Sequence, residues 1–257
     1  MTRLPIPARD VVALTREAQH AGEARGPLLV TGVLAEQLAR ELGAGGAPGA
    51  VRTSGEPARA AALVRVVAGA ATQEDEAQLR AAVRALVPVV AVQTGDPSMR
   101  LPYVLPTDVI PCSPGKGFPI DEIAATLAAA LGPEGPTLAA SLPRLRDAVQ
   151  EGRAVEGATK AGVLAMTGAD KPRLPVLALL QSRTLADIAT AAGRGGSEGP
   201  QDAARAVAPQ LGAALGTGFA AREVVRRIPW RNRLAEGAVA AAATYALAKA
   251  FRHFAAR

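Results

Sequence analysis

The chain has 257 residues, of which 49% are hydrophobic and only 3% aromatic, with one cysteine and a net charge of +6. A single cysteine excludes an intramolecular disulfide and a cysteine-based metal cluster. The length allows one large domain or two small ones, each with its own core. The first residues carry no signal-peptide pattern, so we expect a cytoplasmic protein, or one attached peripherally to the inner face of the cell membrane.

The positive charge is concentrated near the C-terminus. Residues 1–132 hold 12 Lys and Arg against 13 Asp and Glu, a net of −1, whereas residues 133–257 hold 17 against 10, a net of +7. Residues 222–257 alone hold 8 against 2. Such a segment suits an anionic membrane surface or an acidic partner, or forms a solvated arginine-rich helix surface. Nucleic acid is not expected, because neither interleaved aromatics nor a recognised binding motif accompanies the charge.

The N-terminal half predicts an α/β domain. We interpret residues 1–25 as a helical leader. From Gly26 onwards, apolar runs alternate with segments of helical periodicity. The predicted strands are 27–30, 50–53, 63–68, 87–92 and 109–112, and the predicted helices are 34–42, 73–86 and 120–131. Near-continuous apolar strands separated by helices indicate a small parallel, doubly wound sheet over residues 26–132.

The run GPEGP at residues 132–136 is the strongest turn and helix-breaking signal in the chain, and it predicts a domain boundary between residues 132 and 133. Beyond it the pattern predicts an all-helical domain over residues 133–257. The predicted helices are 138–152, 154–167, 175–192, 200–228 and 234–255, with a loop at 193–200 and a connector at 229–233. The most apolar stretches, 206–221 and 237–248, are too short and too rich in alanine to span a bilayer singly.

Candidate ligand-binding residues follow the predicted strands. After the first strand, where a nucleotide hydrolase carries G-x-x-x-x-G-K-[ST], residues 32–38 read GVLAEQL, without the lysine or the hydroxyl. Asp96, in the run QTGD, suits either a base-reading carboxylate or a turn. The run SPGKG at 113–117 suits either an anion cradle built on Ser113, Gly115 and Lys116 or a plain strand-to-helix connection. No catalytic residues and no metal ligands emerge from the sequence.

Residues 26–132 resemble the Era-like branch of translation-factor-related GTPases in the order and spacing of their motifs. The run QTGD takes the place of the guanine-reading N-K-x-D and keeps only Asp96, and SPG at 113–115 takes the place of the following S-A-x loop. The resemblance implies a GTPase-like scaffold. The missing phosphate-binding loop and magnesium ligands imply that hydrolysis has been lost.

Residues 138–257 resemble the YcjF-like domain-of-unknown-function family. The resemblance is carried by LALLQSR at 177–183, by Arg222-Glu223 and by ATYALA at 243–248. It implies membrane association or membrane-linked regulation, with no reaction. The predicted membrane or partner surface combines one aromatic with four arginines: Arg226, Arg227, Trp230, Arg231 and Arg233. An interhelical corner is the alternative interpretation of this cluster.

Together these features predict a non-catalytic pseudo-GTPase scaffold or regulator. Its helical module would associate with a membrane surface or a protein partner, with an active GTPase and a second copy of the chain among the partner classes. No cofactor is expected, although the scaffold would permit GTP or GDP. Two alternatives stay open: an atypical guanine-nucleotide- or anion-binding protein without a phosphate-binding loop, and a membrane-remodelling or pore-forming helical protein.

Overall fold

The computed structural model describes residues 26–95, 100–113, 115–167, 173–194, 216 and 233–255. The chain divides into two compact units, one formed by Ala21–Val149 and the other by Gln150–Arg257 with Met1–His20. Each unit is described by itself. The predicted helical leader at 1–25 lies outside the described residues.

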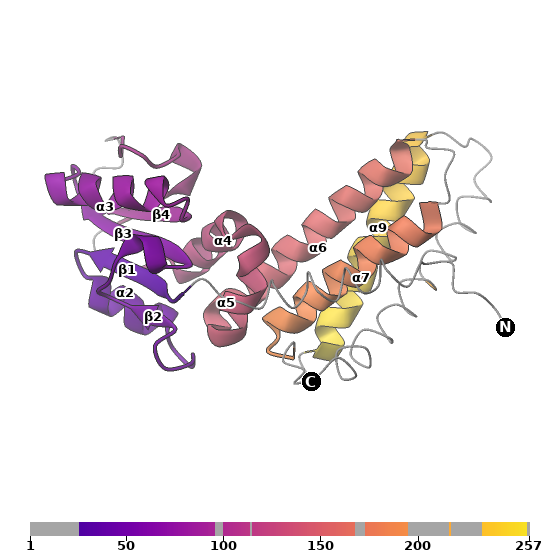
Figure 1. The fold of residues 1–257 in the computed structure, drawn as a ribbon, viewed down its shortest axis with the longest axis horizontal. Coiled ribbons are helices and arrows are strands. Elements are labelled where there is room, and N and C mark those ends of the chain that lie inside the picture. The colour runs from indigo at the N-terminus through magenta and orange to yellow at the C-terminus, as the bar shows by residue number, and fades with distance from the viewer. Residues whose placement is uncertain are drawn as a thin grey trace. The chain divides into compact units, whose positions relative to one another are not determined.

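The first unit is built on one sheet of five parallel strands (Figure 1). All four strand pairs are parallel, and the order across the sheet is β2-β1-β3-β4-β5. The predicted α/β architecture with a parallel sheet is therefore confirmed. This order is one of two common orders in doubly wound folds. The strands are β1 (Leu28–Gly32), β2 (Val51–Arg52), β3 (Ala62–Ala68), β4 (Val89–Thr94) and β5 (Val109–Cys112).

Helices cover both faces of this sheet. Helix α2 contacts β1, α3 contacts β3 and β4, and α4 contacts β4. Figure 1 shows α2 and α3 on opposite sides of the sheet, as right-handed crossovers running in opposite directions from β1 and β3 require. The α-helices of this unit are α2 (Ala35–Leu42), α3 (Gln73–Arg84), α4 (Ile120–Ala130) and α5 (Gly135–Ser141), and the short 3₁₀ turns are η1 (Pro57–Arg59), η2 (Pro106–Asp108) and η3 (Gly132–Glu134).

The apolar strands are buried on both faces, which is why they read as continuous runs in the sequence. The register aligns Leu29, Leu63 and Val89 across β1, β3 and β4. These three side chains belong to one buried cluster with Leu79 and Ala82 of α3. The apolar residues between α3 and this face of the sheet therefore form a buried core.

The β4 strand begins later than predicted. The pattern predicts a strand from residue 87, but β4 begins at Val89. The amide of Val87 instead donates to the carbonyl of Ala82 at the end of α3, 3.0 Å away, and Leu86 takes a left-handed conformation with φ of 56°. Val87, which the apolar pattern assigns to the strand, is therefore hydrogen-bonded to the end of α3 instead.

The first compact unit extends to Val149, beyond the boundary expected at residue 132. Helix α5 is tied to the sheet unit, because the amide of Ala47 donates to the carbonyl of Ser141 over 2.9 Å. An alanine side chain at Gly46 would also lie within 3.0 Å of Leu142. The GPEGP run is a tight turn within this unit, formed by η3 and the start of α5.

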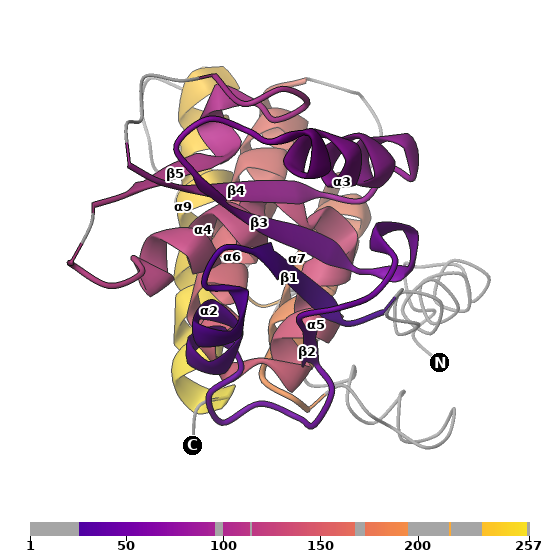
Figure 2. The same cartoon turned by 90° about the vertical axis from the view of Figure 1, so that its left-hand side faces the viewer.

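The described part of the second unit contains helices and no strand. Its helices are α6 (Pro143–Met166), which begins in the first unit, α7 (Arg173–Ala191) and α9 (Arg233–Ala255) (Figure 2). The helices predicted over residues 175–192 and 234–255 match α7 and α9 closely. The helix predicted over residues 200–228, the loop before it and the connector after it lie outside the described residues, apart from Gly193, Arg194, Gly216 and Arg233.

The division of the chain into helices 138–152 and 154–167 is wrong. The break falls instead at Leu142, whose backbone is extended with φ of −127°, and α6 then runs unbroken from Pro143. Proline is tolerated at a first helical position because its missing amide would be unpaired there. Gly152 lies inside α6, where a glycine costs only about 1 kcal/mol relative to alanine.

The helical unit is held by close approach of small residues and by buried polar contacts. A Cβ atom added at Gly162 would lie 3.2 Å from that of Ala241, and one at Gly237 would lie 2.4 Å from Met166. The side-chain amide of Gln181 donates to the Thr244 hydroxyl over 2.9 Å inside the unit. Among the described residues, none of the helices combines the length and apolar character needed to cross a bilayer.

The glycines of α6 provide a test of this packing. A Cβ atom at Gly157 would lie 2.3 Å from the Thr184 hydroxyl and 3.1 Å from its Cβ, whereas nothing lies within 4 Å of one at Gly152. We expect Gly157→Ala to destabilise the protein by about 1–3 kcal/mol through overpacking. Gly152→Ala should stabilise it by about 0.5–1 kcal/mol through helix propensity. Urea unfolding of the two variants measures the contrast, and equal effects would contradict the close α6–α7 contact.

Candidate functional site

The carboxyl edge of the sheet is the place to look for a ligand, because doubly wound sheets bind there, at the point where the strand order reverses. From β1 the chain crosses through α2 to β2 on one side, and from β3 it crosses through α3 to β4 on the other. The reversal point therefore lies between the ends of β1 and β3. Gly32 ends β1 there, opposite Val66 of β3.

The turn from β1 into α2 is tied directly to β3. A Cβ atom at Gly32 would lie 2.0 Å from the carbonyl oxygen of Val66, so only glycine fits this position. The amide of Val33 donates to the same carbonyl over 3.1 Å. In a phosphate-binding loop, successive amides at this position point at the ligand. Here the first of these amides, that of Val33, donates to a carbonyl of β3 and does not point at a ligand.

Two large apolar side chains project from this turn. Val33 is 50% exposed and Leu34 is 56% exposed. Leu34 precedes α2 in a left-handed conformation with φ of 57° and makes no side-chain cap. That conformation costs a residue with a Cβ roughly 1–2 kcal/mol. Backbone strain of this kind clusters at functional positions, which makes the turn a candidate contact site.

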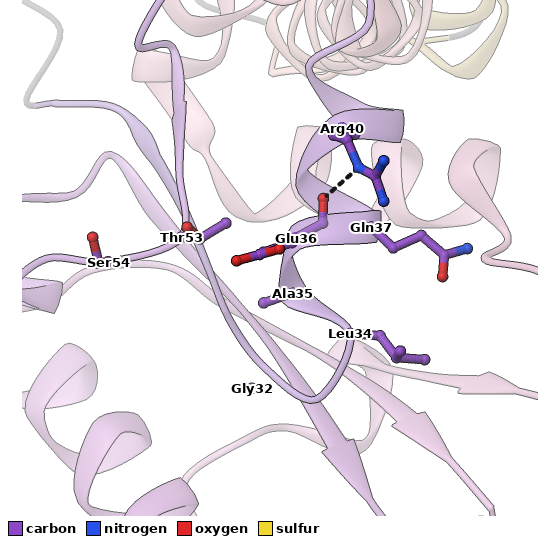
Figure 3. Close-up of a pocket in the computed structure, with 8 residues that line it drawn as sticks. All are labelled: Gly32, Leu34, Ala35, Glu36, Gln37, Arg40, Thr53 and Ser54. Carbon is purple, nitrogen blue, oxygen red and sulfur yellow. Dashed lines mark hydrogen bonds between the residues drawn. The ribbon is translucent and has the colours of Figure 1, made fainter.

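A hollow of about 680 Å³ opens beside the turn (Figure 3). Leu34 and Gln37 lie on one side of α2 in this view, while Thr53 and Ser54, which follow β2, lie on the other. The lining residues are Gly32, Leu34, Ala35, Glu36, Gln37, Arg40, Thr53 and Ser54. Their formal charges sum to zero, from one glutamate and one arginine. The polar groups of the lining are one carboxylate, one guanidinium, one amide and two hydroxyls, from Glu36, Arg40, Gln37, Thr53 and Ser54.

Next to this edge, a buried ion pair fixes the start of α3. The Nε and Nη2 atoms of Arg65 on β3 both lie 2.7 Å from Oδ1 of Asp75. The other carboxylate oxygen accepts from the amide and the hydroxyl of Thr72, at 2.8 and 2.7 Å, which closes a capping box. Both charged side chains are buried. Asp75 therefore anchors the helix to the strand beneath it.

Asp75 is held ionised by these contacts. Burial raises the pKa of Asp75, but the Thr72 amide, the Thr72 hydroxyl and the Arg65 guanidinium outweigh it and leave the pKa below its usual value. A carboxyl group whose pKa is depressed by folding stabilises the native state at pH values above its unfolded pKa, about 3.9. That stability is lost as the pH falls through the lower pKa of the folded state.

Asp75→Asn should cost about 3–5 kcal/mol at neutral pH, because it leaves Arg65 buried without its counter-charge. Below pH 4 the gap between the variant and the parent protein should shrink, since the parent loses the same charge by protonation. Glu74→Gln is the matched control: this neighbour is 78% exposed and lies 3.7 Å from Arg65, so its loss should change stability little. Urea unfolding across pH 3–7 measures both, and equal losses would contradict the buried pair.

The structure brings three of the predicted ligand residues into one turn. Ser113, Gly115 and Lys116 follow β5, and the Lys116 amide donates to the Ser113 carbonyl over 3.3 Å. This turn lies three strands from β1, roughly 14 Å at the usual strand spacing. It is therefore separate from the hollow beside α2. Asp96 lies outside the described residues.

The predicted membrane or partner surface falls almost wholly outside the described residues, which exclude Arg226, Arg227, Trp230 and Arg231. Arg233 is the first residue of α9, and its side chain is not described either. In the described part of the chain, no group of three or more His, Cys, Asp or Glu side chains could hold a metal ion.

None of the candidate site residues predicted from the sequence is among those that line the hollow beside Gly32, the glycine that ends β1. A signal was present: two large apolar residues directly follow that glycine, where a polar turn is usual. Arg65 carried a second signal. An arginine in the middle of an apolar strand needs a buried acid, and the nearest acidic run, residues 74–76, opens the next helix.

No protein-family profile matches the chain, and no curated protein or solved structure matches it. The Era-like and YcjF-like resemblances thus rest on sequence motifs alone. What the fold itself defines is an α/β unit with five parallel strands, followed by helices.

Proposed function

We propose that this protein is a non-catalytic scaffold or regulator whose α/β unit binds a protein partner at the carboxyl edge of its sheet. The observation that carries the proposal is the β1–α2 turn, which presents Val33 and Leu34 to solvent beside a hollow. The helical unit is a second contact module, directed to a membrane surface or a partner by the basic charge of residues 222–257.

The turn is suited to a protein contact because it is both apolar and fixed. Covering an exposed leucine side chain contributes up to roughly 1.5–3 kcal/mol to binding. The tie between Val33 and Val66 holds the turn in one conformation before a partner arrives. A preorganised contact of this kind loses little conformational entropy on binding.

The same turn is poorly suited to a nucleotide. A bound triphosphate needs several free amides and positive charge around it. The Val33 amide is occupied, and Glu36 balances the charge of Arg40 in the lining. An active GTPase and a second copy of the chain are the partner classes that fit the Era-like resemblance.

A titration with fluorescent GTP and GDP, with and without magnesium, tests the non-catalytic part of the proposal. We expect no saturable binding up to high micromolar nucleotide, because the chain lacks the lysine and the hydroxyl of a phosphate-binding loop and the Val33 amide already donates to Val66. Saturable, guanine-selective binding that Asp96→Ala removes would contradict the proposal. It would favour the atypical nucleotide-binding alternative built on Asp96, Ser113, Gly115 and Lys116.

Photo-crosslinking in cells tests the binding face. A benzoylphenylalanine placed at Val33 should give discrete adducts with a protein partner, and Leu34→Ser should abolish them by removing the adjacent apolar contact. The control position is Arg59 in η1, whose side chain is 87% exposed. Equal adducts from both positions, or adducts from Val33 that survive Leu34→Ser, would contradict a specific contact at the turn.

A further inference from the structure

A second hollow lies along α2, next to the first. It has a volume of about 560 Å³, and Gln37 and Arg40 line both hollows. Its other walls come from the start of α4 and the start of α6, all within the first unit. The lining residues are Gln37, Arg40, Glu41, Ala44, Ile120 and Arg144.

Two arginines from different helices line this hollow, and neither forms an ion pair within the described part of the chain. Arg40 donates only to the backbone carbonyl of Glu36, 3.4 Å away, and neither Arg40 nor Arg144 has an ion-pair partner among the described residues. The one acid in the lining, Glu41, accepts a hydrogen bond from Gln37 over 3.0 Å. The lining thus carries a net charge of +1, beside the apolar side chains of Ala44 and Ile120.

We propose that this hollow receives an acidic side chain from the same partner segment that covers Leu34. The inference rests on the proposed function and names the chemistry of its partner. Guanidinium groups bind a carboxylate through paired hydrogen bonds. Arg40 and Arg144 supply them, while Ile120 and Ala44 contact the methylene groups of the incoming side chain.

The surroundings favour a single acidic side chain over a polyanion. Residues 21–149, the unit that contains both arginines, carry 11 basic and 13 acidic side chains, a net of −2, so no broad positive field extends around them. A membrane surface or a nucleic acid attracts proteins through such a field. A concave site also suits an inserted side chain better than it suits a flat lipid surface.

The geometry of α2 sets the spacing of the two contacts. Leu34 and Arg40 are six residues apart and line the same hollow, which places them about 9 Å apart along the helix axis. An extended segment covers that distance in about three residues. The partner segment should therefore carry a large apolar residue and an Asp or Glu roughly three positions apart.

Selection of random dodecapeptides on the purified full-length protein tests this inference. We expect the bound peptides to be enriched in an apolar residue spaced about three positions from an acid. The double variant Arg40→Gln, Arg144→Gln should weaken their binding about tenfold or more, the scale of one lost close charge pair. Arg59→Gln is the matched control, since it removes an exposed arginine elsewhere in the unit and should leave affinity unchanged.

The outcomes separate the inference from the proposed function. Peptides that depend on Leu34 but bind the double arginine variant normally would overturn the inference and leave the proposed function standing. Peptides that depend on the arginines but tolerate Leu34→Ser would support the arginine site and contradict the role of the turn. Bound peptides without acidic enrichment, or no bound peptides at all, would overturn the inference.

Discussion

The close approach of β1 and β3 at Gly32 is the constraint on which the candidate site depends. The carbonyl of Val66 occupies the space that any side chain at Gly32 would need, and it also accepts the amide of Val33. The chain is thereby held against β3 for one residue beyond the strand. It enters α2 only by placing Leu34 in a left-handed conformation, which turns that side chain towards solvent. The exposed apolar corner thus follows from the register of two strands.

The helical unit depends on a different constraint, the size of its residues. With only 3% aromatic residues in the chain, little of the core can be filled by large rings. The helices instead approach closely at glycines such as Gly157 and Gly162. Polar contacts such as the hydrogen bond from Gln181 to Thr244 favour one arrangement of the helices, because buried polar groups are stable only when they are paired.

Most of the α/β unit could be predicted from the sequence, because every strand except the two-residue β2 is an apolar run with a turn signal beside it. The predicted strand 109–112 matches β5, and the predicted helix 120–131 ends one residue beyond α4. The helix break at Leu142 could not be predicted, since Pro143 is equally compatible with a helix start or a loop. Arg65 within an apolar strand indicates a buried acid, but the sequence does not say which of residues 74–76 supplies it. The two hollows depend on how separate elements meet in space, which no local pattern records.

Amide hydrogen exchange at Val33, followed by NMR, tests the central claim most directly. The account predicts that this amide exchanges slowly, like those of β3, because it is bonded to Val66 within the sheet. Its resonance should also stay in place when inorganic phosphate or GTP is added. Rapid exchange at Val33, together with a shift on adding phosphate or GTP, would mean that the turn is an open anion cradle and would contradict the account.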